Sequence, residues 1–171
     1  LRSAAGSQVA HAVARAGYSR VVEIRHANPS DYGRVIQHVN AWWGGREMAP
    51  MLPKLFFLHF EGTSFVAEDE EGNLVAFLIG FVSQTNPDEA YVHFVGVAPE
   101  QRGSGVGRRL YERFFDTARS HGCTTARCVT SPANTGSIAF HEALGFTVDR
   151  IVEDYDGPGE DRALLVRQLS R

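Results

Sequence analysis

The stretch that most constrains this chain is Arg102 to Gly107 (RGSGVG), which places three glycines between two apolar runs. The run before it, Tyr91 to Val97 (YVHFVGV), is rich in β-branched and aromatic residues and stops at Ala98-Pro99, as strands do. The run after it, residues 108–119, repeats apolar residues at helical spacing. The pattern predicts a strand, a tight glycine turn and a helix in succession.

A glycine turn that opens a helix suits a phosphate group, because the first helical N–H groups are unpaired and the helix dipole is positive there. Two other glycine motifs do not fit. A dinucleotide fingerprint from Gly103 requires glycine where Arg108 stands, and a nucleotide P-loop requires a Gly-Lys-Ser/Thr ending that this stretch lacks. Binding of ATP or NAD is therefore disfavoured, and the fitting pattern is R-x-x-G-x-G.

This pattern, preceded by Val95-Gly96-Val97-Ala98-Pro99, resembles the acetyl-CoA-binding motif of the GNAT superfamily of N-acetyltransferases. Residues 134–146 (NTGSIAFHEALGF) are similar to a second motif of that family, N-x-x-[A/S]-x-x-[L/F]-Y-x-x-x-G-F. They depart from it at His141, where the family usually has tyrosine. The likeness in fold extends more loosely from Val22 to the end.

The resemblance implies an α+β, three-layer fold. Its central sheet is mixed and mostly antiparallel, with about seven strands, helices on both faces and a splayed strand pair that holds acetyl-CoA. Local patterns agree with that order of elements. We expect strands over 21–25, 63–67, 74–83, 91–97, 124–129, 146–153 and 162–169, and helices over 32–42, 108–119 and 135–144. Residues 48–60, interrupted by Pro50 and Pro53, are a poor helix and a candidate wall or lid over the acceptor site, or else core together with Trp42 and Trp43.

Length and composition favour one domain, since 171 residues with 43% hydrophobic content can bury a sizeable core. We assign it to residues 21–171, after a flexible N-terminal extension over 1–20 that we favour over a transit peptide. A net charge of −3 gives no general attraction to nucleic acid or anionic membrane, and no apolar run has membrane-spanning length. We expect a cytoplasmic protein. Cys123 and Cys128, expected on one strand, would face opposite sides, and no spacing suggests a disulfide or a metal site.

The activity that the resemblance implies is acetyl transfer from acetyl-CoA, a co-substrate, to the amine of a small molecule or peptide, by direct attack in a ternary complex. The pantetheine arm would lie on the backbone of Val95 and Val97, and Asn134 would bind the arm or cap a helix. Arg102 and Arg108 would add charge at the pyrophosphate or be solvated. The residues of the phosphate loop are Arg102, Gly103, Ser104, Gly105, Val106, Gly107 and Arg108.

Two histidines are candidates for proton transfer, because an alkyl amine with a pKa of about 10 must lose a proton before it attacks. Strand alternation places Tyr91, His93 and Val95 on one face. The family's use of such positions makes His93 the candidate base, unless it is simply packed under the sheet, with Tyr91 or a water-linked Glu89 next. His141 matches the family's tyrosine and is the candidate acid for the thiolate.

Three questions stay open at this level. A GNAT-like module that binds acetyl-CoA without turnover is the alternative to an enzyme. The amine cannot be identified from the sequence. A homodimer is expected only by analogy with the family.

Overall fold

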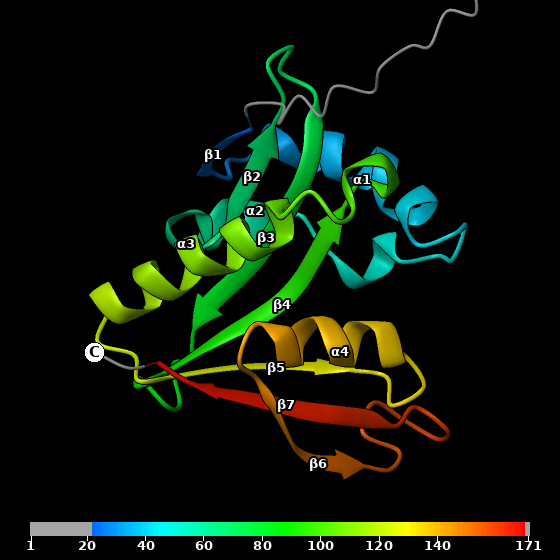
Figure 1. The fold of residues 1–171 in the computed structure, drawn as a ribbon, viewed down its shortest axis with the longest axis vertical. Helices are drawn as coiled ribbons and strands as arrows, with labels where there is room; N and C mark the ends of the chain where they lie inside the picture. The colour runs from blue at the N-terminus through cyan, green and yellow to red at the C-terminus, as the bar shows by residue number, and fades with distance from the viewer. Residues whose placement is uncertain (1–21, 170–171) are drawn as a thin grey trace, which may run out of the picture.

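The computed structural model describes residues 22–169 as a seven-stranded sheet in the order β1-β2-β3-β4-β5-β7-β6, with four α-helices (Figure 1). The strands are β1 (Glu23–His26), β2 (Phe65–Glu68), β3 (Leu74–Val82), β4 (Glu89–Val97), β5 (Thr125–Thr130), β6 (Thr147–Val152) and β7 (Arg162–Gln168). The helices are α1 (Asp31–Trp42), α2 (Leu55–His59), α3 (Val106–Ser120) and α4 (Thr135–Ala143), with 3-10 turns η1 (Ala49–Met51), η2 (Glu61–Thr63) and η3 (Pro99–Gln101).

The predicted mixed sheet is confirmed, because β4 and β5 are parallel and every other neighbouring pair is antiparallel. The predicted elements all occur, with ends shifted by a few residues. The extension expected over residues 1–20 lies outside the described residues. No helix within residues 22–169 is both long and apolar enough to cross a membrane.

Helices cover both faces of the sheet, and β3 is buried between them. Leu78 packs with Phe114 of α3 on one face, whereas Phe77 packs with Val39 of α1 on the other. Neighbouring residues of a strand point to opposite faces, so one apolar strand supplies two cores. Figure 1 shows α3 in front of the sheet and α1 behind it.

A β-bulge interrupts β4 at His93. Ile79 of β3 lies opposite Phe94, but the next residue, Gly80, lies opposite Val92, so His93 is the extra residue. Side chains on the two sides of a bulge no longer alternate as a regular strand predicts. Val92 accordingly packs in the core on the α3 face, and Phe94 packs in the core on the α1 face.

The bulge corrects one sequence prediction. Tyr91, His93 and Val95 do not share a face, since Val95 packs against the core on the α3 side while His93 stacks on Phe56 of α2. Plain alternation fails here because it assumes one residue for each position of the partner strand.

The sheet opens between β4 and β5. Only Glu89 to Tyr91 pair with Thr125 to Arg127, and beyond them the two strands diverge (Figure 1). The N–H of Ala98 donates to the Val75 carbonyl of the β3 side at 2.9 Å. Backbone groups alternate in direction along an antiparallel pair, so those of Val95 and Val97 point away from β3 and into the gap.

A cluster of charged side chains joins α1 to the first strands. The Asp31 carboxylate has no exposed surface and accepts from Arg25 at 2.8 Å and from Arg34 at 3.2 Å, while Glu68 accepts from Arg25 at 2.9 Å. Burial alone would raise the pKa of Asp31, but hydrogen bonds from Arg25 and from the Asn28 N–H outweigh it and lower that pKa.

The two cysteines are buried and free. Cys123 precedes β5 instead of lying on it, so the prediction that both occupy one strand is wrong. The turn after α3 ends one residue later than the apolar pattern indicated.

Candidate active site

The glycine turn lies at the start of α3 and depends on backbone conformations that favour glycine. Gly103 has φ +79° and Gly105, the N-cap of α3, has φ +87°. Side chains rarely tolerate this left-handed region, and the N–H groups of the first turn from Val106 have no partner within the helix. The turn therefore presents backbone donors at the positive end of a helix.

Gly107 serves a different purpose, close packing. A Cβ at this position would lie 3.2 Å from the Phe140 ring of α4 and 3.5 Å from a methyl group of Val97. Its absence brings the start of α3 against both β4 and α4.

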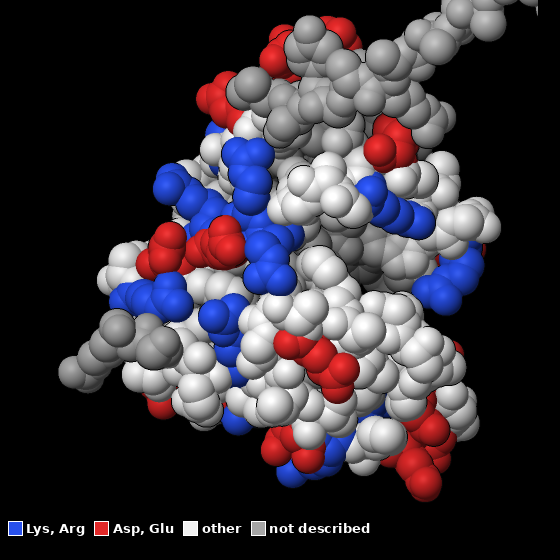
Figure 2. All heavy atoms as spheres, in the orientation of Figure 1, with Lys and Arg blue, Asp and Glu red and all other residues white. Residues whose placement is uncertain are grey.

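The two arginines of the glycine turn donate hydrogen bonds to main-chain carbonyls at the ends of helices. The Arg102 guanidinium donates to the Trp42 carbonyl at the end of α1, and Arg108 donates to the Ala143 carbonyl at the end of α4 at 2.9 Å. Both therefore tie helices to the turn, a use that sequence reasoning did not include. Figure 2 shows Lys and Arg side chains gathered over α3, which carries Arg109 and Arg113 as well, although the net charge is −3.

A cavity of about 850 Å³ lies at the gap between β4 and β5, and residues from both faces of the sheet line it. Trp43, Met48 and Met51 line it from the segment between α1 and α2, whereas Trp42 lies in the core with Trp43 and Met48 packed against it. Both alternatives, wall and core, are therefore confirmed in part. Tyr111 and His141 line it from α3 and α4. The cavity thus joins the two faces through the sheet.

His93 lies on the α2 side of this cavity with one ring nitrogen occupied. Its Nε2 is 2.8 Å from the Met51 carbonyl, and its ring stacks on Phe56 with centroids 4.3 Å apart. A carbonyl can only accept, so Nε2 carries the hydrogen and Nδ1 carries the lone pair. Burial lowers the pKa of His93, although the bond to Met51 opposes that shift, so the neutral ring is favoured at neutral pH.

Tyr91 and Glu89, the other candidates for the base, are less suited. Burial raises the pKa of Tyr91 well above its ordinary value, with Tyr155 and Asp156 of the β6–β7 loop acting in the same direction after it. Its phenol therefore stays protonated at neutral pH. Glu89 is bound to Arg127 at 2.8 Å.

His141 lies on the opposite side of the gap with both ring nitrogens occupied. Its Nδ1 is 2.7 Å from the Ser137 carbonyl, and its Nε2 is 2.7 Å from the hydroxyl of Tyr111. Burial lowers its pKa and the bond to Ser137 opposes that shift. Direct donation from His141 to a thiolate therefore has no free ring nitrogen in this arrangement.

Tyr111 lines the cavity and contacts His141, and it was not among the site residues predicted from the sequence. It has no exposed surface and follows Leu110 in a helix whose Phe114 and Phe115 are core residues, so its spacing indicated packing alone. No signal in the sequence distinguishes its hydroxyl, because the partner, His141, lies thirty positions away.

Asn134 caps α4, as one of its two predicted roles requires. Its side-chain oxygen accepts from the Ser137 N–H at 3.1 Å, and the residue also lines the cavity. Asn134 therefore also lies where it could contact the pantetheine arm of CoA, which is its other predicted role.

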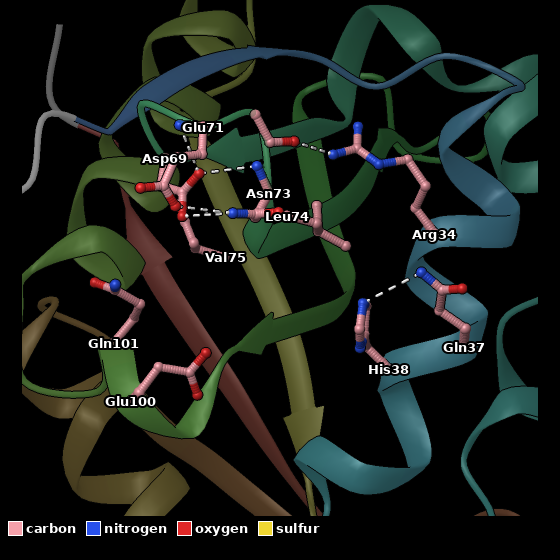
Figure 3. A pocket seen from close by; sticks show the side chains of 11 residues that line it. Arg34, Gln37, His38, Asp69, Glu71, Asn73, Leu74, Val75, Glu100 and Gln101 are labelled. Carbon is pink, nitrogen blue, oxygen red and sulfur yellow. Dashed lines mark hydrogen bonds between the residues drawn. The ribbon is translucent and has the colours of Figure 1, made fainter.

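A second cavity, of about 520 Å³, lies between α1, the β2–β3 turn and η3 (Figure 3). Its polar side chains are partly bound to one another and to the backbone, with Arg34 donating to the Gly72 carbonyl and Asn73 to Asp69. Across residues 22–169, no group of three or more His, Cys, Asp or Glu side chains could hold a metal ion.

Comparison with known proteins gives matches along most of the chain. The model of the "Acetyltransferase (GNAT) family" matches residues 21–146. The chain is 39% identical over 85 residues to L-2,4-diaminobutyric acid acetyltransferase of Nocardia farcinica, covering 50% of this chain and 44% of that protein. It is 31% identical over 105 residues to the ribosomal protein bS18 alanine N-acetyltransferase of Escherichia coli, covering 59% and 68%.

The fold also matches solved structures. Diaminobutyrate acetyltransferase from Paenibacillus lautus, in complex with L-2,4-diaminobutyric acid and coenzyme A, superposes with a TM-score of 0.71 at 21% identity, over 89% of this chain and 98% of that one. At this identity the likeness concerns the fold. The matched segments span about half the length of the first curated relatives, 44% and 57%.

Proposed function

Because this chain belongs to the acetyltransferase (GNAT) family, we propose that it transfers the acetyl group of acetyl-CoA to a primary amine of a small molecule or peptide. The amine attacks the thioester directly in a ternary complex, without an acyl-enzyme. The relatives named for acetylation of diaminobutyric acid and of an alanine amine support amine acceptors as the class.

The observation that carries this proposal is the glycine turn placed beside the open gap in the sheet. The first-turn N–H groups of α3 suit the pyrophosphate of CoA. The backbone groups of Val95 and Val97, directed into the gap, suit the amides of the pantetheine arm as an added strand would. Backbone N–H groups over 94–97 would also stabilise the charge that develops on the thioester oxygen.

His93 is the proposed base. Its Nδ1 carries a lone pair, and among the described residues it has no hydrogen-bond partner, so it can take the proton of the amine directly or through a water. The Met51 carbonyl fixes the tautomer by accepting from Nε2. Phe56 holds the plane of the ring, so both positioning contacts come from the segment over the acceptor side.

The part of the cavity lined by the β6–β7 loop carries negative charge, which supports a cationic amine as the acceptor. Asp156 and Glu160 of the β6–β7 loop line it, and Arg162 binds them at 2.8 and 3.0 Å, which leaves one negative charge among the three. Tyr91 and Tyr155 supply aromatic faces next to these acids, and such faces attract cations.

A thiol-release assay tests the function, with L-2,4-diaminobutyrate, an alanine-initiated peptide, polyamines and aminoglycosides as acceptors. We expect release with at least one amine. Titration calorimetry should show binding of acetyl-CoA and none of ATP or NAD. Binding of acetyl-CoA without release from any amine would instead favour the non-catalytic module.

Gly105→Val tests the loop assignment. The side chain would be strained at φ +87° and would stand where the phosphate must approach, so acetyl-CoA affinity should fall by about tenfold or more. Gly72→Val is the matched control, because Gly72 has φ +79° in the β2–β3 turn with open space around it. If calorimetry gave Gly105→Val and Gly72→Val the same affinity for acetyl-CoA, the phosphate would lie elsewhere.

Other features stay predictions from the sequence. These are the single domain over 21–171, the cytoplasmic location, the homodimer, and the lack of nucleic-acid and membrane partners. Size-exclusion chromatography with light scattering would test the homodimer.

A further inference from the structure

The position where the resembled family usually has a tyrosine holds His141, and a phenol from another helix lies against that histidine. We propose that Tyr111 gives a proton to the departing thiolate of CoA and that His141 acts behind it as the positioning residue that restores the proton. The inference rests on the acetyl transfer proposed above, and it concerns a residue outside both sequence motifs.

The geometry fixes the direction of one end of this hydrogen-bonded chain. The Ser137 carbonyl accepts from Nδ1 of His141, so in the neutral ring Nε2 has no hydrogen and must accept from the Tyr111 hydroxyl. In the imidazolium, Nε2–H donates to the phenol oxygen instead. The hydroxyl hydrogen of Tyr111 is then released for a third group, and Tyr111 and His141 both line the cavity at the sheet gap.

The proton transfer balances with these groups alone. The carbon–sulfur bond of the thioester breaks, and its electron pair goes to sulfur. Tyr111 O–H gives its proton to sulfur and forms the thiol, while Nε2–H of the imidazolium gives a proton to the phenol oxygen. His141 becomes neutral and regains its proton from solvent before the next turnover.

The charged groups near Tyr111 and His141 bind other atoms or face solvent, so they do not interrupt the hydrogen bond between these two residues. From β5 the Cys128 thiol faces Tyr111, and burial raises its pKa to about 12, so it stays neutral. Arg108 of α3 and Arg167 of β7 bind the carbonyls of Ala143 and Leu144 at the end of α4. Glu112 and Glu142, on the two helices that carry the pair, are exposed. The Ser137 hydroxyl lies 3.4 Å from Nδ1 of His141, and the rings of Phe115, Phe140 and Phe146 pack against Tyr111.

The first test needs no acceptor. Calorimetry in acid, where His141 is most protonated and frees the Tyr111 hydroxyl, would compare CoA with desulfo-CoA, which lacks the thiol, in the parent and in Tyr111→Phe. A hydrogen bond to sulfur should make the parent prefer CoA by about three- to tenfold, and Tyr111→Phe should abolish that preference while desulfo-CoA affinity stays the same. An equal preference in parent and variant would overturn the role of Tyr111. A parent that bound neither ligand would sink the proposed function itself, and this inference with it.

The second test reads turnover against pH with the amine that the panel identifies. Tyr111→Phe should lower kcat by about tenfold near pH 6, and the ratio of parent to variant should shrink toward one as pH rises, because the imidazolium disappears. A purely structural hydroxyl would give a ratio that does not change with pH, and that result would overturn the relay.

Two further variants separate chemistry from folding. Tyr111→Phe leaves Nε2 of His141 buried without a donor, whereas Tyr111→Phe/His141→Phe removes both partners and should lose the preference for CoA equally. Tyr111→Phe/His141→Tyr puts a phenol back on α4 and should regain turnover over Tyr111→Phe. Tyr32→Phe, on α1 against Phe57 and outside the cavity lining, is the control phenol and should match the parent. If Tyr111→Phe turned over like the parent and Tyr111→Phe/His141→Tyr gave no gain over it, the assignment of the acid to Tyr111 would be refuted.

Discussion

His93 and His141 lie on opposite faces of one sheet, at either side of one gap, and burial lowers the pKa of both. The two histidines differ in how many of their ring nitrogens have a hydrogen-bond partner. Met51 occupies one nitrogen of His93, whereas Ser137 and Tyr111 occupy both nitrogens of His141. Residue type and pKa direction therefore do not separate the two roles. The available lone pair separates them, and it is the basis on which we propose proton removal on the α2 face and proton return on the α3 face.

The largest expected effect comes from His93→Ala. Loss of the base should lower kcat by about a hundredfold or more, with acetyl-CoA affinity nearly unchanged. In the proposed mechanism the neutral ring of His93 is the active form and burial lowers its pKa, so parent kcat should rise with pH through a midpoint below about 6.5. Loss of the His141 proton should in turn lower kcat by up to about tenfold. His93→Ala should lose that midpoint.

His121→Ala, at the end of α3, is the matched control for that measurement. Parent-like turnover in His93→Ala across about pH 6 to 9 would remove His93 from the mechanism. A group acting through water, such as Glu89, would then be the next candidate.

A smaller effect is expected from His141→Phe. Thiolate is a good leaving group, so kcat should fall by about tenfold or less, and the loss should be greatest at low pH. His141→Tyr, which restores the family's usual residue, should keep more activity than His141→Phe. If His141→Phe cost as much as His93→Ala in the same kcat assay, the division of roles between the two faces would be wrong.

Phe56→Ala should affect one histidine and spare the other. Removing the stacked ring exposes His93, so its pKa should rise toward its ordinary value and the midpoint of the kcat profile should move up. We expect a loss of only about twofold to tenfold in the plateau kcat, because the Met51 contact remains. An unmoved midpoint would show that Phe56 does not set the environment of His93.

Asp31→Asn should leave both histidines and kcat unchanged while lowering the free energy of unfolding by about 2 to 4 kcal/mol. The pKa of Asp31 is lowered in the folded state, so the carboxylate stabilises the fold above its unfolded pKa of about 4 and stops doing so as pH falls through the folded value. Urea denaturation should show the full difference from the parent at neutral pH and a smaller one in acid. A change in kcat near that of Phe56→Ala would link α1 to the chemistry.

The fold could be predicted from the sequence because its signals are local. The glycines before α3, the turn residues and the apolar periods each act within a few positions, and the two motifs resemble one family. The prolines at 50 and 53 similarly indicated that residues 48–60 form no long helix, and the segment holds only the short η1 and α2.

The candidate site could be predicted only in part, because its geometry depends on pairing between distant residues. The bulge at His93 is defined by the register of β4 against β3, and no pattern within β4 reveals it. Tyr111 occupies a core-like helical position, and only the approach of α4 turns its hydroxyl into a partner of His141.

Only three pairs of facing residues make up the backbone ladder between β4 and β5. A pantetheine arm along Val95 and Val97 would extend that seam with a strand that is not polypeptide and that departs after every turnover. The free energy of unfolding would then depend on the concentration of acetyl-CoA, and it would rise by about 2.7 kcal/mol when that concentration is a hundred times the dissociation constant. Resistance to proteases would rise with it. When acetyl-CoA is scarce, this chain would therefore unfold, and expose itself to proteases, more often.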